Sequence, residues 1–304
     1  MASNILNGCF GVNVSVALLV AALAAAPCAA APKPRSKATP EQSLEARLFD
    51  AFQRRDTVEL ERAALGSARA ARAAALAAAP LLPRSWLLLP DLVPRCADRD
   101  RAIALAAAEA THQIAEDLRQ PELQQNDDLP ETLAPWARQL GKLAADRQIS
   151  VDVRVKCLQA LAQLLELCTI PLEPLLSLLD EPEPAVRRAS TELFGHGSSE
   201  AARARLAKLV ATDSAPTVAR AAAAVLCASV PLRAPKSSPE LTALQDAGAL
   251  PRLREISQDS DAGIDELLDV ARCLTRSGTA ADRKALKALQ ARSASLRRQL
   301  SHLD

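Results

Sequence analysis

The feature that most constrains the fold is an internal repeat in the second half of the chain. Four segments of similar pattern begin at Val153, Val186, Val218 and Ile264, at intervals of 33, 32 and 46 residues. Each follows an acidic, turn-prone lead, and a further apolar helical pattern precedes each lead. One such unit cannot cover its own apolar sides. The repeat therefore predicts helix pairs that stack on one another, with a loop insertion in the longest interval.

The stretch DEPEPAVRRASTELFG, residues 180–195, indicates how one junction between helices is built. Pro182 and Pro184 prevent the preceding helix from continuing. Asp180 and Glu183 favour the exposed amides in the first turn of the next helix. We expect Val186 to begin the inward face of that helix, so that the chain reverses and two amphipathic helices pack together.

Composition points to the same fold class. Hydrophobic residues make up 49% of the 304 residues, but aromatic residues only 2%, and the apolar content is mostly Ala and Leu. Those are the best helix formers, whereas a sheet protein normally draws on β-branched and aromatic residues. We predict an all-α fold, an α-solenoid of stacked antiparallel helix pairs.

The helix pair with Asp and Pro in its turn and a VRxxA start to its second helix resembles the HEAT repeat. The short 32 to 33 residue period is similar to the bacterial form found in phycobilin lyase subunits. The resemblance covers about residues 130 to 275. It implies an armadillo-like solenoid in which the turn Asp and the second-helix Arg form a polar ladder between successive repeats.

The ladder candidates follow from this resemblance. The matching residues pair Asp180 with Arg187 and, less closely, Asp146 with Arg154. The third repeat has Ala219 in the place of the arginine, so Arg220 is the expected substitute beside Asp213. The fourth repeat retains a turn aspartate, Asp259, but has Asp265 where the arginine should be.

The implied function is a non-catalytic scaffold that binds a protein or peptide on the solenoid surface, because extended rigid surfaces collect several modest contacts. We expect Arg188 and Arg220 to contact the partner. The lyase resemblance gives the alternative of an accessory subunit for cofactor attachment. A nucleic-acid-binding protein ranks third, since 37 basic and 36 acidic residues leave a formal charge of only +1.

Catalytic signatures are weak. Of three histidines, His112 lies four residues before Glu116, which we interpret as a helix-surface pair. His196 lies beside Ser198 and Ser199, which we interpret as a helix end followed by a cap. Five cysteines after residue 31 favour small buried side chains over a disulfide framework. We predict no catalytic residue, no metal and no cofactor.

The chain before the repeats divides into three parts. Residues 1–30 include an uncharged apolar run that predicts a cleaved signal peptide or an N-terminal anchor, and 31–40 read as a flexible leader. This predicts a periplasmic or secreted protein, with membrane-anchored and cytoplasmic locations as alternatives. We assign 41–128 to irregular helical repeats and 129–304 to HEAT-like repeats that end in a capping helix.

Two local patterns make sharper predictions. Prolines at 80, 83, 90 and 94 allow only short helical pieces in that segment, and a long helix is expected from about Asp98 to Leu118. In the last two dozen residues, leucines at helical spacing and six basic residues predict an amphipathic helix with a solvated basic face.

Overall fold

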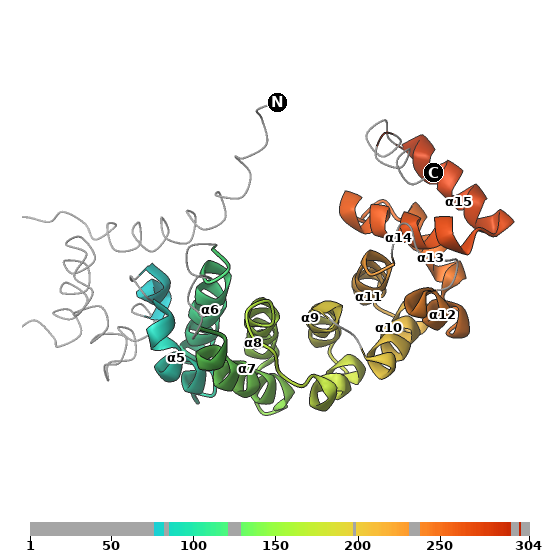
Figure 1. The fold of residues 1–304 in the computed structure, drawn as a ribbon. Coiled ribbons are helices and arrows are strands. Elements are labelled where there is room, and N and C mark those ends of the chain that lie inside the picture. Colours follow the sequence, from blue (N-terminus) through green and yellow to red (C-terminus); the bar gives the residue numbers. More distant parts are fainter. Residues whose placement is uncertain are drawn as a thin grey trace, which may run out of the picture. The chain divides into compact units, whose positions relative to one another are not determined.

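The computed structural model describes residues 76–81, 85–120, 129–196, 199–230, 238–292 and 298. These residues all belong to one unit of the chain, Glu41–Asp304. They form helices and turns and contain no β-strand, so the predicted all-α class is confirmed (Figure 1). The predicted signal or anchor, the leader and the first part of the irregular helical repeats, up to residue 75, lie outside the described residues.

The helices follow one another with short connections. In chain order they are η1 (Ala79–Leu81), η2 (Ser85–Leu88), α5 (Leu89–Arg95), α6 (Arg101–Asp117), α7 (Leu129–Ala145), α8 (Val151–Leu164), η3 (Glu173–Asp180), α9 (Pro184–Leu193), η4 (Phe194–His196), α10 (Glu200–Thr212), α11 (Pro216–Ala228), α12 (Pro239–Asp246), α13 (Leu250–Gln258), α14 (Ile264–Ser277) and α15 (Ala280–Arg292). Within these elements, no helix is long and apolar enough to cross a membrane.

Local sequence explains where several helices begin. Asp100 caps α6 by accepting a hydrogen bond from the Ala102 amide, and Ser238 caps α12 in the same way through the Leu241 amide. Pro184 and Pro216 occupy the first position of α9 and α11, where the missing N–H costs nothing. The long helix expected from about Asp98 is α6.

The proline-rich segment behaves as predicted. Between residues 79 and 95 the described chain forms only the two short 3₁₀ helices η1 and η2 and the seven-residue helix α5. Pro90 lies near the start of α5, and Pro94 lies inside its last turn. Because a proline ring cannot continue an α-helical ladder, no longer helix forms there.

The helices contact one another in pairs and in two series. The pairs are α5 with α6, α7 with α8, η3 with α9, α10 with α11, and α13 with α14. The second members also contact their neighbours in order, α6–α8–α9–α11–α14. The first members do the same, α5–α7–η3–α10–α13, and α15 contacts both α13 and α14. The contacts of each pair are therefore mainly with the pairs next to it.

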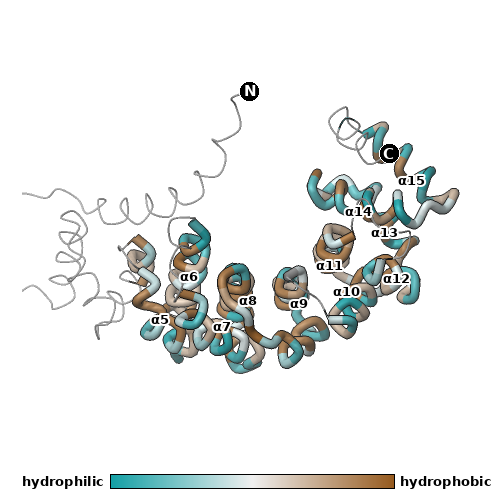
Figure 2. Tube along the Cα trace, viewed as in Figure 1, coloured by the Kyte–Doolittle hydropathy of each residue, from teal (hydrophilic) through white to brown (hydrophobic). Residues whose placement is uncertain are grey.

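Small and branched apolar residues fill the spaces between these helices. One buried cluster runs from Leu76 to Ala285, and a smaller one joins Leu267, Ala271 and Leu289 of α14 and α15. Figure 2 shows that the labelled helices combine hydrophobic and hydrophilic stretches, as amphipathic helices do. Val153, Val186 and Val218, which begin three of the repeat segments, are all buried.

The fourth repeat segment was aligned wrongly. Ile264 is 50% exposed and is the first residue of α14, whereas Val153, Val186 and Val218 are each the third residue of their helices. Leu267, one turn further along α14, is the buried residue of that segment. Successive residues are about 100° apart around a helix, so the first and the third position of a helix face nearly opposite sides. Similar letters at these two positions therefore do not mark the same face.

The segment expected to cap the chain forms α15 over Ala280–Arg292. Ala285 and Leu289 are buried against the preceding helices, while Arg283, Lys284 and Lys287 are exposed. Residues beyond 292, apart from 298, lie outside the described residues. The amphipathic pattern is therefore confirmed for the part of this segment that can be described.

Candidate functional site: an arginine ladder and the hollow at its third rung

Three arginines at one interval connect successive helix pairs. Arg154, Arg187 and Arg220 follow each other at spacings of 33 residues and lie near the start of α8, α9 and α11. Each forms an ion pair with a carboxylate at the turn of the next helix pair: Arg154 with Glu181, Arg187 with Asp213 and Arg220 with Asp259. We call these three contacts the arginine ladder and number its rungs in chain order.

The first rung is the most deeply buried. The side chains of Arg154 and Glu181 are only 2% and 5% exposed, and Arg154 Nη2 donates to Glu181 Oε2 over 2.6 Å. Arg154 Nε donates to the Ala144 carbonyl at the end of α7. The exposed Arg147 donates through Nε and Nη2 to the other oxygen of Glu181. One carboxylate thereby holds the end of α7, the start of α8 and the turn before α9 together.

At the second rung the arginine contacts both oxygens of the carboxylate. Arg187 donates through Nε and Nη2 to both oxygens of Asp213, over 2.7 and 2.9 Å. Its Nη1 donates to the carbonyls of Glu181 and Pro182, in the turn of its own helix pair. Bidentate pairs of this kind are the strong, geometrically specific ones. The Arg187 guanidinium therefore satisfies backbone carbonyls in the turn of its own helix pair and also binds the carboxylate in the turn of the next pair.

The third rung is looser. Among the described residues Arg220 makes one hydrogen bond, from Nη1 to Asp259 Oδ2 over 2.9 Å. Its Nε is buried and has no hydrogen-bond partner among the described residues. The Asp259 side chain is 28% exposed, against 3% for Asp213. Arg220 is the fifth residue of its helix, whereas Arg154 and Arg187 are the fourth, so it leaves the helix about 100° further round.

Aspartates of the ladder also cap the turns. Asp213 and Asp259 each accept a hydrogen bond from the amide two residues later, Ala215 and Asp261. Asp146 does the same with the amide of Gln148. Such Asx turns satisfy backbone groups that the helix ends leave open. Asp146 therefore fixes its own turn and is not the partner of Arg154.

The expected pairing of Asp180 with Arg187 is also wrong. Asp180 is an exposed residue that pairs with Arg205 of α10, and Arg205 also donates to the Leu176 carbonyl. The carboxylate that Arg154 contacts is the adjacent Glu181. Sequence reasoning missed Glu181 because it matched the turn residue by type, as an aspartate. The spacing distinguishes the two acidic residues, since Glu181 lies five residues before Val186 just as Asp213 lies five before Val218.

The carboxylates of the ladder titrate differently from free ones. Burial disfavours the charged form of Glu181, but hydrogen bonds from Arg154 and Arg147 outweigh it and hold the pKa of Glu181 below its usual value. Burial also acts against the Asp213 charge, and Arg187 again lowers the pKa. At Asp259 the Asp261 amide is the largest cause of a lowered pKa, ahead of Arg220. The turn that contains Asp259 thus also stabilises its charged carboxylate.

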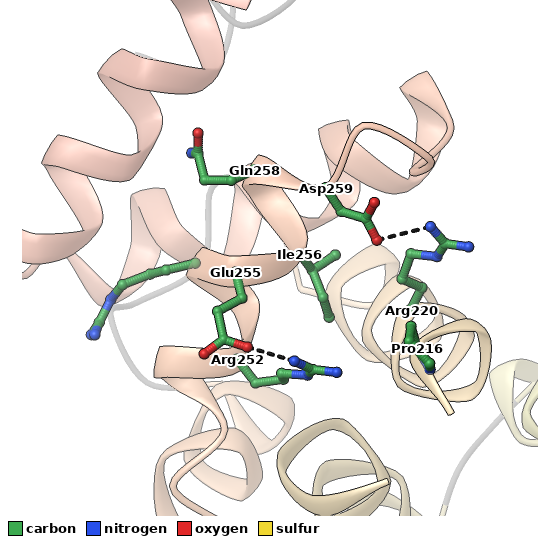
Figure 3. A pocket seen from close by; sticks show the side chains of 8 residues that line it. Pro216, Arg220, Arg252, Glu255, Ile256, Gln258 and Asp259 are labelled. Carbon is green, nitrogen blue, oxygen red and sulfur yellow. Dashed lines mark hydrogen bonds and ion pairs between the residues drawn. The ribbon is translucent and has the colours of Figure 1, made fainter. Parts of the chain in front are cut away.

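A hollow of about 610 Å³ borders the third rung (Figure 3). It is lined by Pro216, Arg220, Arg252, Arg254, Glu255, Ile256, Gln258 and Asp259. Figure 3 shows the Arg220–Asp259 pair and the Arg252–Glu255 pair on its border, with Ile256 between them. Arg254 is anchored through Nε to the buried Asp282 of α15 over 2.7 Å.

A second hollow, of about 490 Å³, lies along α7. Its lining consists of Pro135, Arg138, Gln139, Lys142, Leu143 and Asp146. Arg138 and Lys142 are exposed. This surface therefore presents basic side chains beside the turn that Asp146 caps.

The other residues selected from the sequence lie apart from these hollows. Arg188 is exposed on α9, close enough to Glu192 for their charges to interact. His112 is half-buried on α6, and burial and then Lys156 lower its pKa. Ser199 accepts a hydrogen bond from the Ala202 amide and caps α10, which confirms the helix-cap interpretation of that segment. No group of three metal-ligating side chains gathers among the described residues.

Comparison with known proteins adds no family. No family model matches the sequence, and no curated protein matches it.

Proposed function

We propose that the chain is a HEAT-like α-solenoid that serves as a non-catalytic scaffold for a protein or peptide. The observation that supports this most directly is the order of helix contacts, in which the first and the second members of successive pairs each contact their neighbours in turn. Repeat proteins have this property, because each unit covers the apolar side of the next. The arginine ladder supports the same proposal, since each rung joins one unit to the following one.

The physical basis for binding is rigidity combined with repetition. Ion pairs buried at successive turns resist sliding of one helix pair against another, because any shift would leave a buried charge without its partner. A surface held in this way can present side chains at fixed spacing without losing much conformational entropy on binding. Arg188, exposed on α9 next to Arg187 of the second rung, is the side chain that we propose as a partner contact.

The test is site-specific photo-cross-linking in the cells from which the protein comes. A photoreactive residue would replace Arg188 on α9 or, as the control, Lys208, which is exposed on α10 of the other helix series. The scaffold proposal predicts that one protein species is cross-linked from position 188 and much less from position 208. Mass spectrometry would identify the linked peptide.

The contrary result is equally specific. If neither position cross-links a protein and the native chain instead purifies with a bound linear tetrapyrrole, seen by visible absorption, the scaffold proposal is wrong. That result would favour the accessory role in cofactor attachment.

A further inference from the structure

We propose that the hollow at the third rung is a binding site for one carboxylate of an acidic peptide segment in a protein partner. This inference rests on the proposed scaffold function and specifies the chemistry of the partner. It begins with a comparison inside the molecule. Three arginines occupy related positions in successive helix pairs, but of the three only Arg220 has a buried Nε without a hydrogen-bond partner among the described residues.

The contrast between the rungs is chemical. A guanidinium has five N–H donors. Arg187 directs donors at both oxygens of Asp213 and at two backbone carbonyls, and Arg154 directs donors at Glu181 and at the Ala144 carbonyl. Within the described part of the chain Arg220 makes one hydrogen bond, to Asp259, and its buried Nε has no partner. A buried guanidinium donor without a partner costs free energy, and an incoming oxygen acceptor would recover it.

The inserted helix explains why room exists at this rung. The interval from the start of the α11 segment to that of α14 is the longest of the repeat, and it contains the additional helix α12. At the first two rungs the carboxylates are 5% and 3% exposed, so the turns close around them. Asp259 is 28% exposed, and the hollow of about 610 Å³ lies directly beside it.

The charge of the lining favours a single carboxylate. Three arginines against Glu255 and Asp259 leave one net positive charge in the lining. Just outside it, the opposite charges of Asp282 and Arg292 balance each other. One carboxylate would neutralise the hollow, whereas a phosphate dianion would leave it negative.

Arg252 supplies the second contact. Among the described residues its ion-pair partner is Glu255, three residues later on the same helix, and the Glu255 side chain is 63% exposed. Exposed pairs of this kind contribute little to stability, so Arg252 can turn to a ligand at small cost. Arg254 is fixed by the buried Asp282 and provides a stationary positive charge at the same border. Ile256 gives the ligand an apolar contact between the charged pairs.

The probe for the test is a fluorescein-labelled hexaglutamate peptide, with hexaglutamine as the uncharged control. Fluorescence anisotropy of the full chain should show saturable binding of hexaglutamate and none of hexaglutamine. Arg220→Lys keeps the charge and the contact with Asp259 but removes the guanidinium donors, so we expect affinity to fall about tenfold. Arg252→Gln should weaken binding as well.

The matched control is Arg188→Lys, the same substitution at an exposed arginine outside the hollow. We expect it to leave hexaglutamate affinity unchanged. An equal loss from Arg188→Lys would show diffuse charge attraction and overturn the proposal, as would wild-type protein that does not bind hexaglutamate. Thermal unfolding would verify that each variant is folded.

A measurement on the unaltered protein avoids any effect of substitution on folding. In ¹⁵N–¹H spectra, the Nε–H resonance of Arg220 should shift on adding hexaglutamate, while that of the fully engaged Arg187 should not. If Arg220 does not respond and the cross-link from position 188 persists, the acidic-peptide site is wrong and the scaffold function stands. If that cross-link is also absent, both fail.

Discussion

At the scale of single residues, the ladder shows what an apolar helical core demands of a buried charge. Arg154 is 2% exposed within a core of Ala and Leu side chains. A charge in that position is tolerated only when it is paired and its remaining donors are satisfied. Arg154 is paired with Glu181 and also donates to the Ala144 carbonyl. The rung therefore holds the α7–α8 turn and the η3–α9 turn in one relative position.

Neighbouring residues provide a direct test of this point. Glu181→Gln leaves the buried Arg154 charge without its partner and should lower the free energy of unfolding by about 3 kcal/mol. Asp180→Asn removes a carboxylate one residue earlier, in an exposed pair with Arg205, and should change it by about 0.5 kcal/mol or less. Urea unfolding of both variants checks the prediction. Equal effects would mean that the rung contributes no more than a surface pair.

The same substitution predicts a pH dependence. Because the pKa of folded Glu181 is lowered, its contribution is complete above its unfolded pKa, near pH 4.3, and is lost as pH falls through the folded pKa. The protonated glutamic acid then resembles glutamine. The stability difference between wild type and Glu181→Gln should thus be constant from pH 7 to about pH 5 and shrink below about pH 4. A difference that grew on acidification would contradict the assigned charge state.

The sequence was least informative about which side chains form ion pairs with each other. The repeat placed Arg154, Arg187 and Arg220 among the ladder residues, and all three reach carboxylates. The resemblance implied contacts between successive repeats but assigned the wrong carboxylates to the arginines, because ion-pair partners are set by helix rotation and turn length. Matching by residue type selects Asp180, which is exposed, whereas the spacing to Val186 selects Glu181, which is buried.

At the scale of helices, close packing of small residues places cysteines where reagents cannot reach them. Cys96, Cys157, Cys168, Cys227 and Cys273 are free and buried. Contact with the Cys96 thiol and burial raise the pKa of Cys157, and burial raises the pKa of Cys168 and, together with the Cys273 thiol, that of Cys227. These thiols behave as apolar side chains of the helix contacts.

We therefore expect the five thiols to resist alkylation in the folded protein. Iodoacetamide at neutral pH should label none of them within the time that labels all five in urea, because both burial and a raised pKa suppress the reactive thiolate. Peptide mass spectrometry assigns each site. Rapid labelling of Cys157 or Cys227 in native buffer would show that the helices around them are packed less tightly than described.

Helix ends carry a further prediction. Gly278 follows α14 with φ of 65°, in the left-handed region where a side chain is strained. Gly278→Ala should lower the free energy of unfolding by about 1 kcal/mol, and Gly278→Asn by less, since Asn tolerates this conformation better. Thermal or urea unfolding of the two variants measures the difference. Equal losses from Ala and Asn would mean that the backbone angle is not the cause.

The positions of the helices were easier to predict from the sequence than the alignment of the repeat segments with one another. Proline positions, capping residues and Ala/Leu content are local properties, so the short pieces before residue 96, α6 and the all-α class followed from them. The fourth repeat segment was misaligned at Ile264 because one-residue differences at a helix start change the face without changing the pattern. The extra helix α12 lies within an interval that sequence reasoning assigned to a loop insertion.

At the scale of the whole molecule, contacts between successive helix pairs imply that stability is shared mainly between neighbours. Under the proposed solenoid, the free energy is close to a sum of unit and interface contributions. A single large core would instead spread the effect of any buried change over the entire fold. A change at the first rung of the ladder can distinguish shared neighbour contacts from a single core, because this rung lies far along the chain from α13, α14 and α15.

Native-state hydrogen exchange of wild type and Glu181→Gln, measured peptide by peptide, tests this central claim most directly. The account predicts faster exchange in α7, α8, η3 and α9, which meet at the first rung, and unchanged exchange in α13, α14 and α15. Uniformly faster exchange from α5 to α15 would contradict it, because the described helices would then form one cooperative core and not a series of units joined by an arginine ladder.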